Sequence, residues 1–276
     1  MTKLNQKKIA LINDVTGFGR CSIAVSLPIV SALKVQCSFI PTAILSNHTD
    51  FNNFFFEDYT PKMKEYISNW EKLGLSFDAI YTGFLGSKEQ IEIVIEFLEK
   101  FKTDNNIIVI DPVMGDYGNL YSTYTDEMCV EMKKLVKHAT ILTPNLTELY
   151  RLLDLPYPKS APSHEELYSL CKKLSIDGPN KIVVTGIQRE NMIENFVFES
   201  NKPFEIISVE KIGKDRCGTG DVFTSIISAS VVKGENFASS IKKATDFISK
   251  SLKFTNNLNL PSSHGVCFEE FLTELK

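Results

Sequence analysis

Short runs of apolar residues alternate with longer segments of helical periodicity along almost the whole chain. The apolar runs predict strands at 9–13, 36–45, 79–84, 107–110, 140–143 and 181–185. The periodic segments predict helices near 21–33, 61–73, 87–102, 125–137, 145–153, 163–175, 218–232 and 236–252. Continuous apolar strands joined by helices are typical of a parallel sheet that helices cover on both faces.

One part of the chain departs from this alternation. Two β-rich runs, 191–198 and 204–211, follow each other across a short polar turn, which predicts an antiparallel hairpin at one edge of the sheet. No repeat, low-complexity tract or long linker interrupts the pattern. We therefore expect one α/β domain over residues 1–276 with three layers, a mostly parallel central sheet, helices on both faces and an antiparallel edge hairpin.

Composition narrows the class of protein. A hydrophobic fraction of 43% and a charged fraction of 23% are ordinary for a globular protein with a sizeable core. The net charge of −4 argues against a nucleic-acid partner that needs a basic face. The six cysteines are scattered without zinc-type spacing, which is typical of reduced thiols, and no apolar stretch approaches the ~20 residues that cross a bilayer. We expect a cytoplasmic protein without a membrane partner.

Polar residues end most of the predicted strands, which is where parallel α/β sheets bind ligands. They include an amide and a carboxylate, hydroxyl groups and a histidine. In chain order they are Asn13, Asp14, Ser46, His48, Thr49, Asp111, Thr143, Asn145, Thr185 and Gly186. Phe84 ends the third strand and is either a core residue or a face on which an aromatic substrate stacks. A lone histidine is more often structural than catalytic, so His48 is expected to bind rather than to transfer protons.

The segment Arg-Cys-Gly-Thr-Gly-Asp at 216–221 opens directly into an apolar helix. The free N–H groups of a helix start, in Gly218, Thr219 and Gly220, attract an anion such as a phosphate. A carboxylate at Asp221 would repel that anion, but it makes sense as a base that takes the proton of an alcohol while the N–H groups stabilise a transferred phosphoryl group. The plain alternative is a capped helix start, since Gly and Asp are both favoured there.

Two further segments can likewise be interpreted as part of a binding site or as ordinary local structure. Asp111 ends a strand, and Asp116 follows in a glycine-containing loop, which suits Mg²⁺ bound to phosphate or else two ordinary turns. Asn145 and Glu148 are spaced as a helix capping box, which explains both residues. They could equally position the water ligands of a metal, and the two roles are compatible.

Taken together, these motifs resemble the ribokinase-like superfamily and, within it, the pyridoxal/pyridoxamine kinase family. The resemblance extends from about residue 8 to 252. It rests on the segments Ser-Asn-His-Thr at 46–49, Thr-Gly-Phe at 82–84, Asp-Pro-Val-Met-Gly-Asp at 111–116 with Tyr121 beyond, Thr-Pro-Asn-Leu-Thr-Glu at 143–148, Val-Thr-Gly at 184–186 and Gly-Thr-Gly-Asp at 218–221. The last motif identifies the superfamily, whereas the first and third are more specific to vitamin B6 kinases.

The resemblance implies transfer of the γ-phosphoryl group of ATP to the 5′-hydroxyl of pyridoxal, pyridoxamine or pyridoxine. Asp221 would be the base, and the amides of Gly218, Thr219 and Gly220 would form the anion hole. Mg²⁺ and the phosphates would be organised by Asp111, Asn145 and Glu148, with Asp111 and Glu148 as the metal residues. ATP would also be contacted by Asp116, Tyr121, Thr143, Thr185 and Gly186. The vitamer would be contacted by Ser46, His48, Thr49 and Phe84. A monovalent cation such as K⁺ and a homodimer are further expectations.

One segment departs from the family pattern. Members often have a serine in the first strand–helix loop that bonds the pyridine nitrogen, and here Asn13 or Asp14 takes its place. Cys217, just before the anion hole, is either a packing residue or a thiol that reacts reversibly with the aldehyde of pyridoxal. Hydroxymethylpyrimidine (phosphate) kinase of thiamine synthesis shares the fold and the motif at 218–221 and is the alternative enzyme. A non-catalytic vitamer- or nucleotide-binding protein is the alternative outside catalysis.

Overall fold

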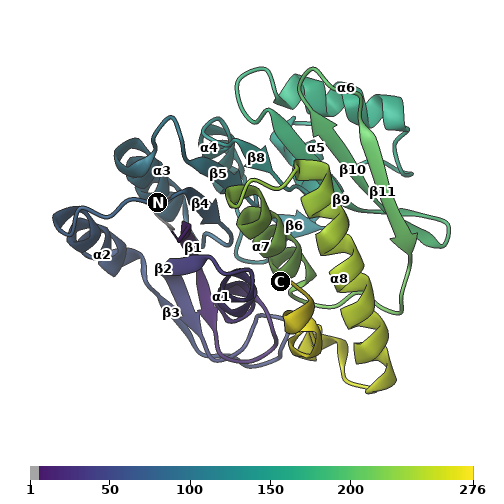
Figure 1. The fold of residues 1–276 in the computed structure, drawn as a ribbon, viewed down its shortest axis with the longest axis horizontal. Helices are drawn as coiled ribbons and strands as arrows, with labels where there is room; N and C mark the ends of the chain where they lie inside the picture. The colour runs from purple at the N-terminus through teal and green to yellow at the C-terminus, as the bar shows by residue number, and fades with distance from the viewer. Residues whose placement is uncertain (1–5, 276) are drawn as a thin grey trace, which may run out of the picture. The chain divides into compact units, whose positions relative to one another are not determined.

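The computed structural model describes residues 6–275. Within that range a nine-stranded sheet has the order β11-β10-β9-β8-β5-β4-β1-β2-β3 (Figure 1). Its strands are β1 (Lys8–Thr16), β2 (Gln36–Leu45), β3 (Phe56–Asp58), β4 (Ala79–Thr82), β5 (Ile107–Ile110), β8 (Ile141–Leu142), β9 (Lys181–Arg189), β10 (Met192–Glu199) and β11 (Glu205–Glu210). The helices are α1 (Ser22–Ala32), α2 (Thr60–Lys72), α3 (Lys88–Phe101), α4 (Asp126–Val136), α5 (Leu146–Leu152), α6 (His164–Leu174), α7 (Thr219–Val232) and α8 (Phe237–Asn257).

The strand pairing confirms the predicted fold class. β1 pairs with β2, β5 with β8, and β8 with β9, in each case in parallel. β10 pairs antiparallel with both β9 and β11, which is the predicted edge hairpin. At the other edge, the short strand β3 pairs antiparallel with β2. The sheet is therefore mostly parallel, with antiparallel strands at its edges.

The described residues form two compact units. The first contains residues 6–81, 103–106 and 212–275, and the second contains residues 82–102 and 107–211. The chain enters the second unit near the end of β4 and returns to the first before α7. The assignment of a single domain to residues 1–276 stays a prediction.

In the first unit, α1, α7 and α8 pack together beside β1 and β2, and α2 lies on the other side of these strands (Figure 1). Every residue of α7 from Val222 to Val232 is buried. A helix that is buried all round needs small or apolar side chains on every face, and its sequence supplies Val, Ile, Ala, Ser, Thr and one Phe. The helix is therefore anchored in the core directly after its first turn, in which Thr219 and Asp221 are half-buried and Gly220 is exposed.

In the second unit, α4 packs on both α3 and α5, and α6 packs on β10. The carboxyl ends of β5 and β8 are aligned with the start of β9, because Ile110 of β5 pairs with Leu142 of β8, which pairs with Ile182 of β9. An isolated parallel bridge between Asn145 and Thr185 extends this alignment beyond β8. Asn145, after β8, thus lies beside Thr185 in the middle of β9.

The structure differs from the prediction mainly at element ends. β1 continues to Thr16, three residues beyond the predicted end, because Asn13, Asp14 and Thr16 are polar yet buried. α8 continues to Asn257. The elements that the sequence pattern missed are short: β3, the hairpin of β6 (Gly115–Asp116) and β7 (Asn119–Leu120), and two 3₁₀ helices at Ser262–His264 and Glu269–Leu275.

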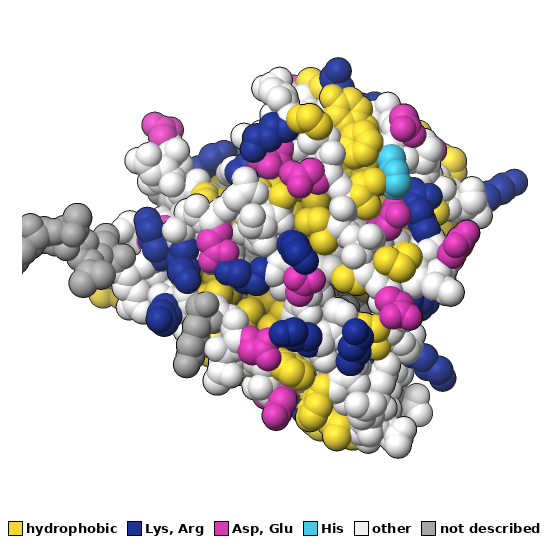
Figure 2. Space-filling model, turned by 45° about the vertical axis from the view of Figure 1, so that its right-hand side comes forward, with side chains coloured by type: hydrophobic (Ala, Val, Ile, Leu, Met, Phe, Trp, Pro, Cys, Tyr) yellow, Lys and Arg dark blue, Asp and Glu magenta, His cyan; other side chains and the backbone are white. Residues whose placement is uncertain are grey.

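The surface carries charges of both signs. Figure 2 shows basic and acidic side chains interspersed over one face, with hydrophobic side chains between them. Among the residues that the structure describes, every helix is too short or too polar to span a membrane.

Candidate active site

Asp221 lies in the first turn of α7, and the protein holds both of its carboxylate oxygens. Oδ1 accepts a hydrogen bond from the Asn13 side-chain amide at 3.1 Å. Oδ2 accepts one from the backbone N–H of Ser22 at 2.8 Å. The end of β1, the start of α1 and the start of α7 therefore meet at this carboxylate and fix its orientation.

The loop that supplies the Ser22 amide has an unusual backbone. Arg20 and Ser22 have φ angles of 52° and 59°, and Gly19 has a φ of 116°. Positive φ values are costly for residues with a side chain and persist only where the surroundings impose them. Here they direct the Ser22 N–H at Asp221.

Gly218 is the N-cap of α7 and has a φ of 80°. A Cβ atom at this position would lie 1.9 Å from the carbonyl oxygen of Arg20, so only glycine fits. Thr219 anchors the turn through a 3.3 Å hydrogen bond from its hydroxyl to the Arg216 carbonyl. The N–H groups of a first helical turn have no partner within the helix, and here they include those of Thr219 and Gly220. The turn thus places backbone N–H groups beside a fixed carboxylate.

The two candidates at the end of β1 have different surroundings. The Asn13 side chain bonds Asp221 and also accepts the N–H of Asp14 at 3.0 Å. Asp14 is buried and accepts the Thr16 hydroxyl at 2.5 Å. Burial raises the pKa of Asp14, and hydrogen bonds from Ser22 and Thr16 oppose the rise. Of the two residues, Asn13 is the one whose side chain contacts Asp221.

The loop after β2 carries Ser46, His48 and Thr49. Ser46 is exposed, and its hydroxyl donates to the Asn47 side chain at 2.7 Å and accepts the N–H of Phe55 at 2.9 Å. Thr49 is exposed, whereas His48 is buried with its Nε2 2.7 Å from the Ser263 carbonyl oxygen. Hydrogen bonds within the loop therefore hold part of it in place.

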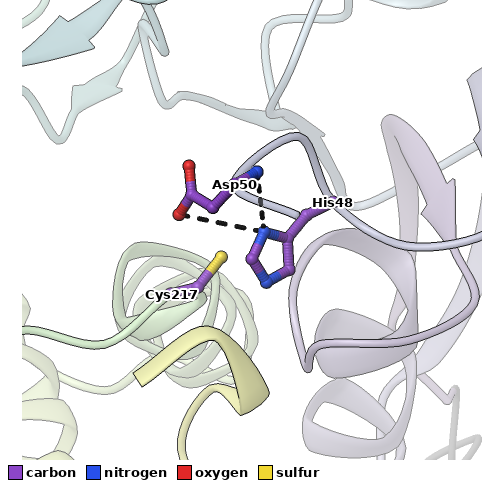
Figure 3. A group of neighbouring side chains, drawn as sticks. All are labelled: His48, Asp50 and Cys217. Carbon is purple, nitrogen blue, oxygen red and sulfur yellow. Dashed lines mark hydrogen bonds and ion pairs between the residues drawn. The ribbon is translucent and has the colours of Figure 1, made fainter. Parts of the chain in front are cut away.

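His48 also lies beside Cys217, as Figure 3 shows. A hydrogen bond from Cys21 and the nearby His48 lower the pKa of Cys217 to about 6, against the opposing effect of burial. The hydrogen bond with Cys217 is the main reason why the pKa of His48 is raised to about 9. The two groups thus favour each other's charged forms. The sequence places these residues far apart and gave no sign of this contact.

In the second unit, Glu148 is the third residue of α5, and its carboxylate is fully engaged. It accepts the N–H of Asn145 at 2.8 Å and the N–H of Met114 at 3.2 Å. The Asn145 side chain accepts the N–H of Glu148 at 3.0 Å in return, which confirms the capping box. Its amide also donates to the Gly115 carbonyl at 2.8 Å, so Asn145 ties α5 to the β6 segment.

Asp111 lies directly after β5, buried, and its charge acts on Glu148. Burial is the largest cause that raises the pKa of Glu148 well above its ordinary value, and the neighbouring Asp111 adds to it. Two buried carboxylates that repel each other form a donor set that a divalent cation relieves, and Mg²⁺ prefers such oxygen ligands. The residues therefore fit the predicted metal.

The remaining predicted nucleotide residues also lie in the second unit. Thr143 is buried after β8, and the Thr185 N–H bonds the Pro144 carbonyl at 2.9 Å. Gly186 is exposed, with a φ of 68° and open space where a side chain would be. Asp116 and Tyr121 are exposed on and just after the β6–β7 hairpin. Phe84 is half-buried just after β4.

Known proteins are similar to this chain over most of its length. The family model described as phosphomethylpyrimidine kinase matches residues 28–267. A crystal structure of a provisionally assigned phosphomethylpyrimidine kinase from Bacteroides thetaiotaomicron is 37% identical, covers 100% of this chain and 96% of its own, and has a TM-score of 0.96. A second crystal form of that protein, with pyridoxal, is also 37% identical, covers 98% of this chain and 96% of its own, and gives a TM-score of 0.94.

Curated relatives are more distant. A pyridoxal kinase of Actinobacillus pleuropneumoniae is 26% identical over 87% of this chain and 86% of its own length. The thiamine biosynthetic bifunctional enzyme of Arabidopsis thaliana is 26% identical over 90% of this chain. The matched region is 47% of that enzyme, so the chain spans about half of its length.

The fold and the helix-start motif define a kinase of the ribokinase-like class. Within that class, the chain belongs to the phosphomethylpyrimidine kinase family, to which pyridoxal kinases are also similar.

Proposed function

We propose that this protein phosphorylates the 5′-hydroxyl of a vitamin B6 vitamer with ATP. The observation that carries the proposal is the geometry at Asp221, a carboxylate fixed through both oxygens in the same turn as the Gly218, Thr219 and Gly220 amides. A B6 vitamer as the substrate is supported by the Bacteroides relative. That protein is 37% identical to this chain, and one of its crystal forms was obtained with pyridoxal.

In the proposed reaction, Asp221 accepts the proton of the substrate hydroxyl. The hydroxyl oxygen then forms a bond to the γ-phosphorus while the bond from that phosphorus to the β-phosphate oxygen breaks. The amides of the turn stabilise the negative charge of the transferred group. Phosphoryl transfer depends mainly on positioning and charge stabilisation, so these groups can supply the protein's main contribution. Asn13 and the Ser22 N–H keep the carboxylate oriented throughout.

Asp111 and Glu148 would hold Mg²⁺, which neutralises phosphate charge when bound. Asn145 would keep Glu148 in place through the capping box. Asp116, Tyr121, Thr143, Thr185 and Gly186 would contact ATP. A monovalent cation such as K⁺ remains part of the proposal.

The vitamer would be bound by residues of the β1 and β2 ends and by Phe84, which we propose stacks on the pyridine ring. Ser46, His48 and Thr49 would bond the ring substituents. Asn13 or Asp14 would bond the ring nitrogen. Because Asn13 already bonds the proposed base, its replacement affects catalysis as well as binding.

The deciding experiment measures ADP formation with pyridoxal, pyridoxamine, pyridoxine and hydroxymethylpyrimidine. Wild type is compared with Asp221→Asn, which keeps the size of the side chain but removes the base. We expect turnover with a B6 vitamer and a loss of about 100- to 10,000-fold in the variant. ATP binding, measured by calorimetry, should stay within a few-fold. Full activity of Asp221→Asn would exclude it as the base.

A second candidate is hydroxymethylpyrimidine (phosphate) kinase. It is favoured by the matching family model and by the Arabidopsis relative of thiamine biosynthesis. Turnover of hydroxymethylpyrimidine with no turnover of the three vitamers would establish it in place of the B6 activity. Binding without any turnover would instead support a non-catalytic vitamer- or nucleotide-binding protein.

A further inference from the structure

Three side chains with different metal-binding atoms converge in the first unit. His48 and Asp50 come from the loop after β2, and Cys217 comes from the segment before α7. One ligand atom of each, a ring nitrogen, a carboxylate oxygen and a sulfur, lies within 4.8 Å of the other two. Figure 3 shows the Cys217 sulfur directed toward the His48 ring, with Asp50 above both.

The His48 ring is oriented as in a metal-binding histidine. Its Nε2 lies 2.7 Å from the Ser263 carbonyl, which only accepts, so Nε2 carries the hydrogen. Nδ1 is then the lone-pair nitrogen of the neutral ring; it accepts the backbone N–H of Asp50 at 3.3 Å and lies 3.8 Å from an Asp50 carboxylate oxygen. A metal ion at Nδ1 would take the place of that N–H. Histidine ligands commonly donate their second N–H to a backbone carbonyl in this way. The ring also packs against Gly19, where a Cβ would lie 2.1 Å from it.

The Cys217 sulfur has a hydrogen-bond partner outside the cluster. The thiol of Cys21 is hydrogen-bonded to Cys217 and is buried at the start of α1. A ligand fixed by a second hydrogen bond costs less to order when a cation arrives. Asp50 is exposed, so an ion can reach the cluster from solvent.

The donor set selects the kind of ion. A thiolate and an imidazole suit Zn²⁺ and similar borderline metals, whereas Mg²⁺ prefers oxygen ligands only. The thiolate and the carboxylate together carry two negative charges, which match a divalent cation. Three protein ligands leave one tetrahedral position for water.

We propose that His48, Asp50 and Cys217 form a binding site for Zn²⁺ or a metal of the same class, separate from the Mg²⁺ residues Asp111 and Glu148. Nδ1, a carboxylate oxygen and Sγ are the ligands, and the proton shared by the ring and the thiol leaves to solvent when the ion binds. The proposal does not depend on the kinase function, because it rests on this cluster alone.

The test is a metal titration of the purified full chain without ATP or vitamer. Zn²⁺ is titrated against a chromophoric chelator, and Co²⁺ is used as a spectroscopic probe. Wild type should bind one equivalent and show a thiolate-to-cobalt charge-transfer band. Cys217→Ser should lose the band, and His48→Ala and Asp50→Asn should each bind Zn²⁺ at least about tenfold more weakly.

The matched control is Cys37→Ser, which removes a partly exposed cysteine of β2 outside the cluster. It should bind Zn²⁺ as wild type does. The proposal is overturned if wild type binds no stoichiometric zinc, if Cys217→Ser keeps the band, or if Cys37→Ser loses it.

A second measurement uses unaltered protein, so it does not depend on the folding of a variant. The rate of Cys217 alkylation is followed by peptide mass spectrometry with and without Zn²⁺. We expect at least about tenfold protection by one equivalent of Zn²⁺ and none by Mg²⁺, because only a metal bound through sulfur removes the nucleophile. Equal alkylation rates with and without Zn²⁺ would contradict the site.

Discussion

At the scale of single residues, the proposed base Asp221 is held in place by two other segments of the chain. Asn13 and the Ser22 amide each hold one oxygen of Asp221, and both lie about two hundred residues before it. A carboxylate held in this way loses little orientation entropy when a substrate arrives, which is the benefit that positioned catalytic groups give. The proposed function of Asp221 therefore depends on residues that are not themselves chemically reactive.

Asn13→Ala removes the side-chain hydrogen bond to Asp221. Hydrogen bonds to charged groups contribute about 1.5–3 kcal/mol, so we expect kcat to fall about 10- to 100-fold. Steady-state kinetics with ATP and the preferred vitamer measure the change. Asn69→Ala, in the exposed part of α2, is the control and should leave kcat unaltered. Equal kcat values for Asn13→Ala and wild type would show that the contact does not orient the base.

Cys217 gives a prediction about pH. Alkylation requires the thiolate, which forms as pH rises through a pKa of about 6. With a chelator present, the rate should therefore reach half of its maximum near pH 6 and stay constant above neutral pH. His48→Ala removes one of the groups that lower this pKa, so its midpoint should move toward the ordinary thiol value of 9.0. A midpoint near 9.0 in wild type would contradict the lowered pKa of Cys217. Reaction of Cys217 with the aldehyde of pyridoxal stays a prediction.

The sequence could predict which residue types matter but not their partners. Asp221 and the glycines stand out because a carboxylate after Gly-Thr-Gly is chemically distinctive. The contact of Asn13 with Asp221 and the cluster of His48, Asp50 and Cys217 join residues far apart in the chain. Such contacts depend on how the helices pack, and no local pattern encodes them.

At the scale of elements, the start of α7 depends on the absence of a side chain. Gly218→Ala would place Cβ 1.9 Å from the Arg20 carbonyl, so the turn or the loop at residue 20 must move. Gly234, just after α7, is the matched control, with a φ of 91° and nothing within 4 Å of its Cβ position. We expect Gly234→Ala to cost about 1–2 kcal/mol in unfolding free energy from its backbone conformation alone.

Gly218→Ala should lower the free energy of unfolding further than Gly234→Ala and should abolish turnover. Thermal or denaturant unfolding measures the first effect, and ADP formation the second. If both variants were equally stable and active, the close contact with Arg20 would not be needed for the site.

Element types were predictable because the apolar runs and the helical periods are strong. β2 and β5 have the predicted ends, and the edge hairpin is confirmed. β3 was missed because its three residues, Phe56–Asp58, are all exposed and have no alternation of apolar and polar residues. The β6–β7 hairpin was missed because each of its strands has only two residues.

At the scale of the whole molecule, the resemblance predicts a homodimer. The edge of the sheet at β3 and the segment before it expose Ile44, Phe54, Phe55 and Phe56, with Phe55 61% exposed. Exposed apolar groups beside an edge strand are typical of an interaction surface. We expect light scattering to give twice the chain mass of 31.1 kDa, and Phe55→Asp to give the mass of one chain. A wild-type monomer would contradict the prediction.

The mostly parallel sheet covered by helices could be predicted because each strand is a short apolar run and each helix has a periodic pattern of apolar residues. The division of the described residues into two compact units could not, since no linker or change of composition marks it. The chain crosses between the units within β4, around residues 103–106 and just after β11, and the crossing within β4 lies in a buried strand. The cytoplasmic location stays a prediction.

The two hydrogen bonds that hold Asp221 also have a consequence for synthesis on the ribosome. Asn13 and Ser22 emerge early, whereas Asp221 and the rest of α7 emerge about two hundred residues later. A nascent chain that has completed β1 and β2 still lacks the proposed base. The carboxylate can be held by Asn13 and Ser22 only after α7 has been made and packs against these early segments.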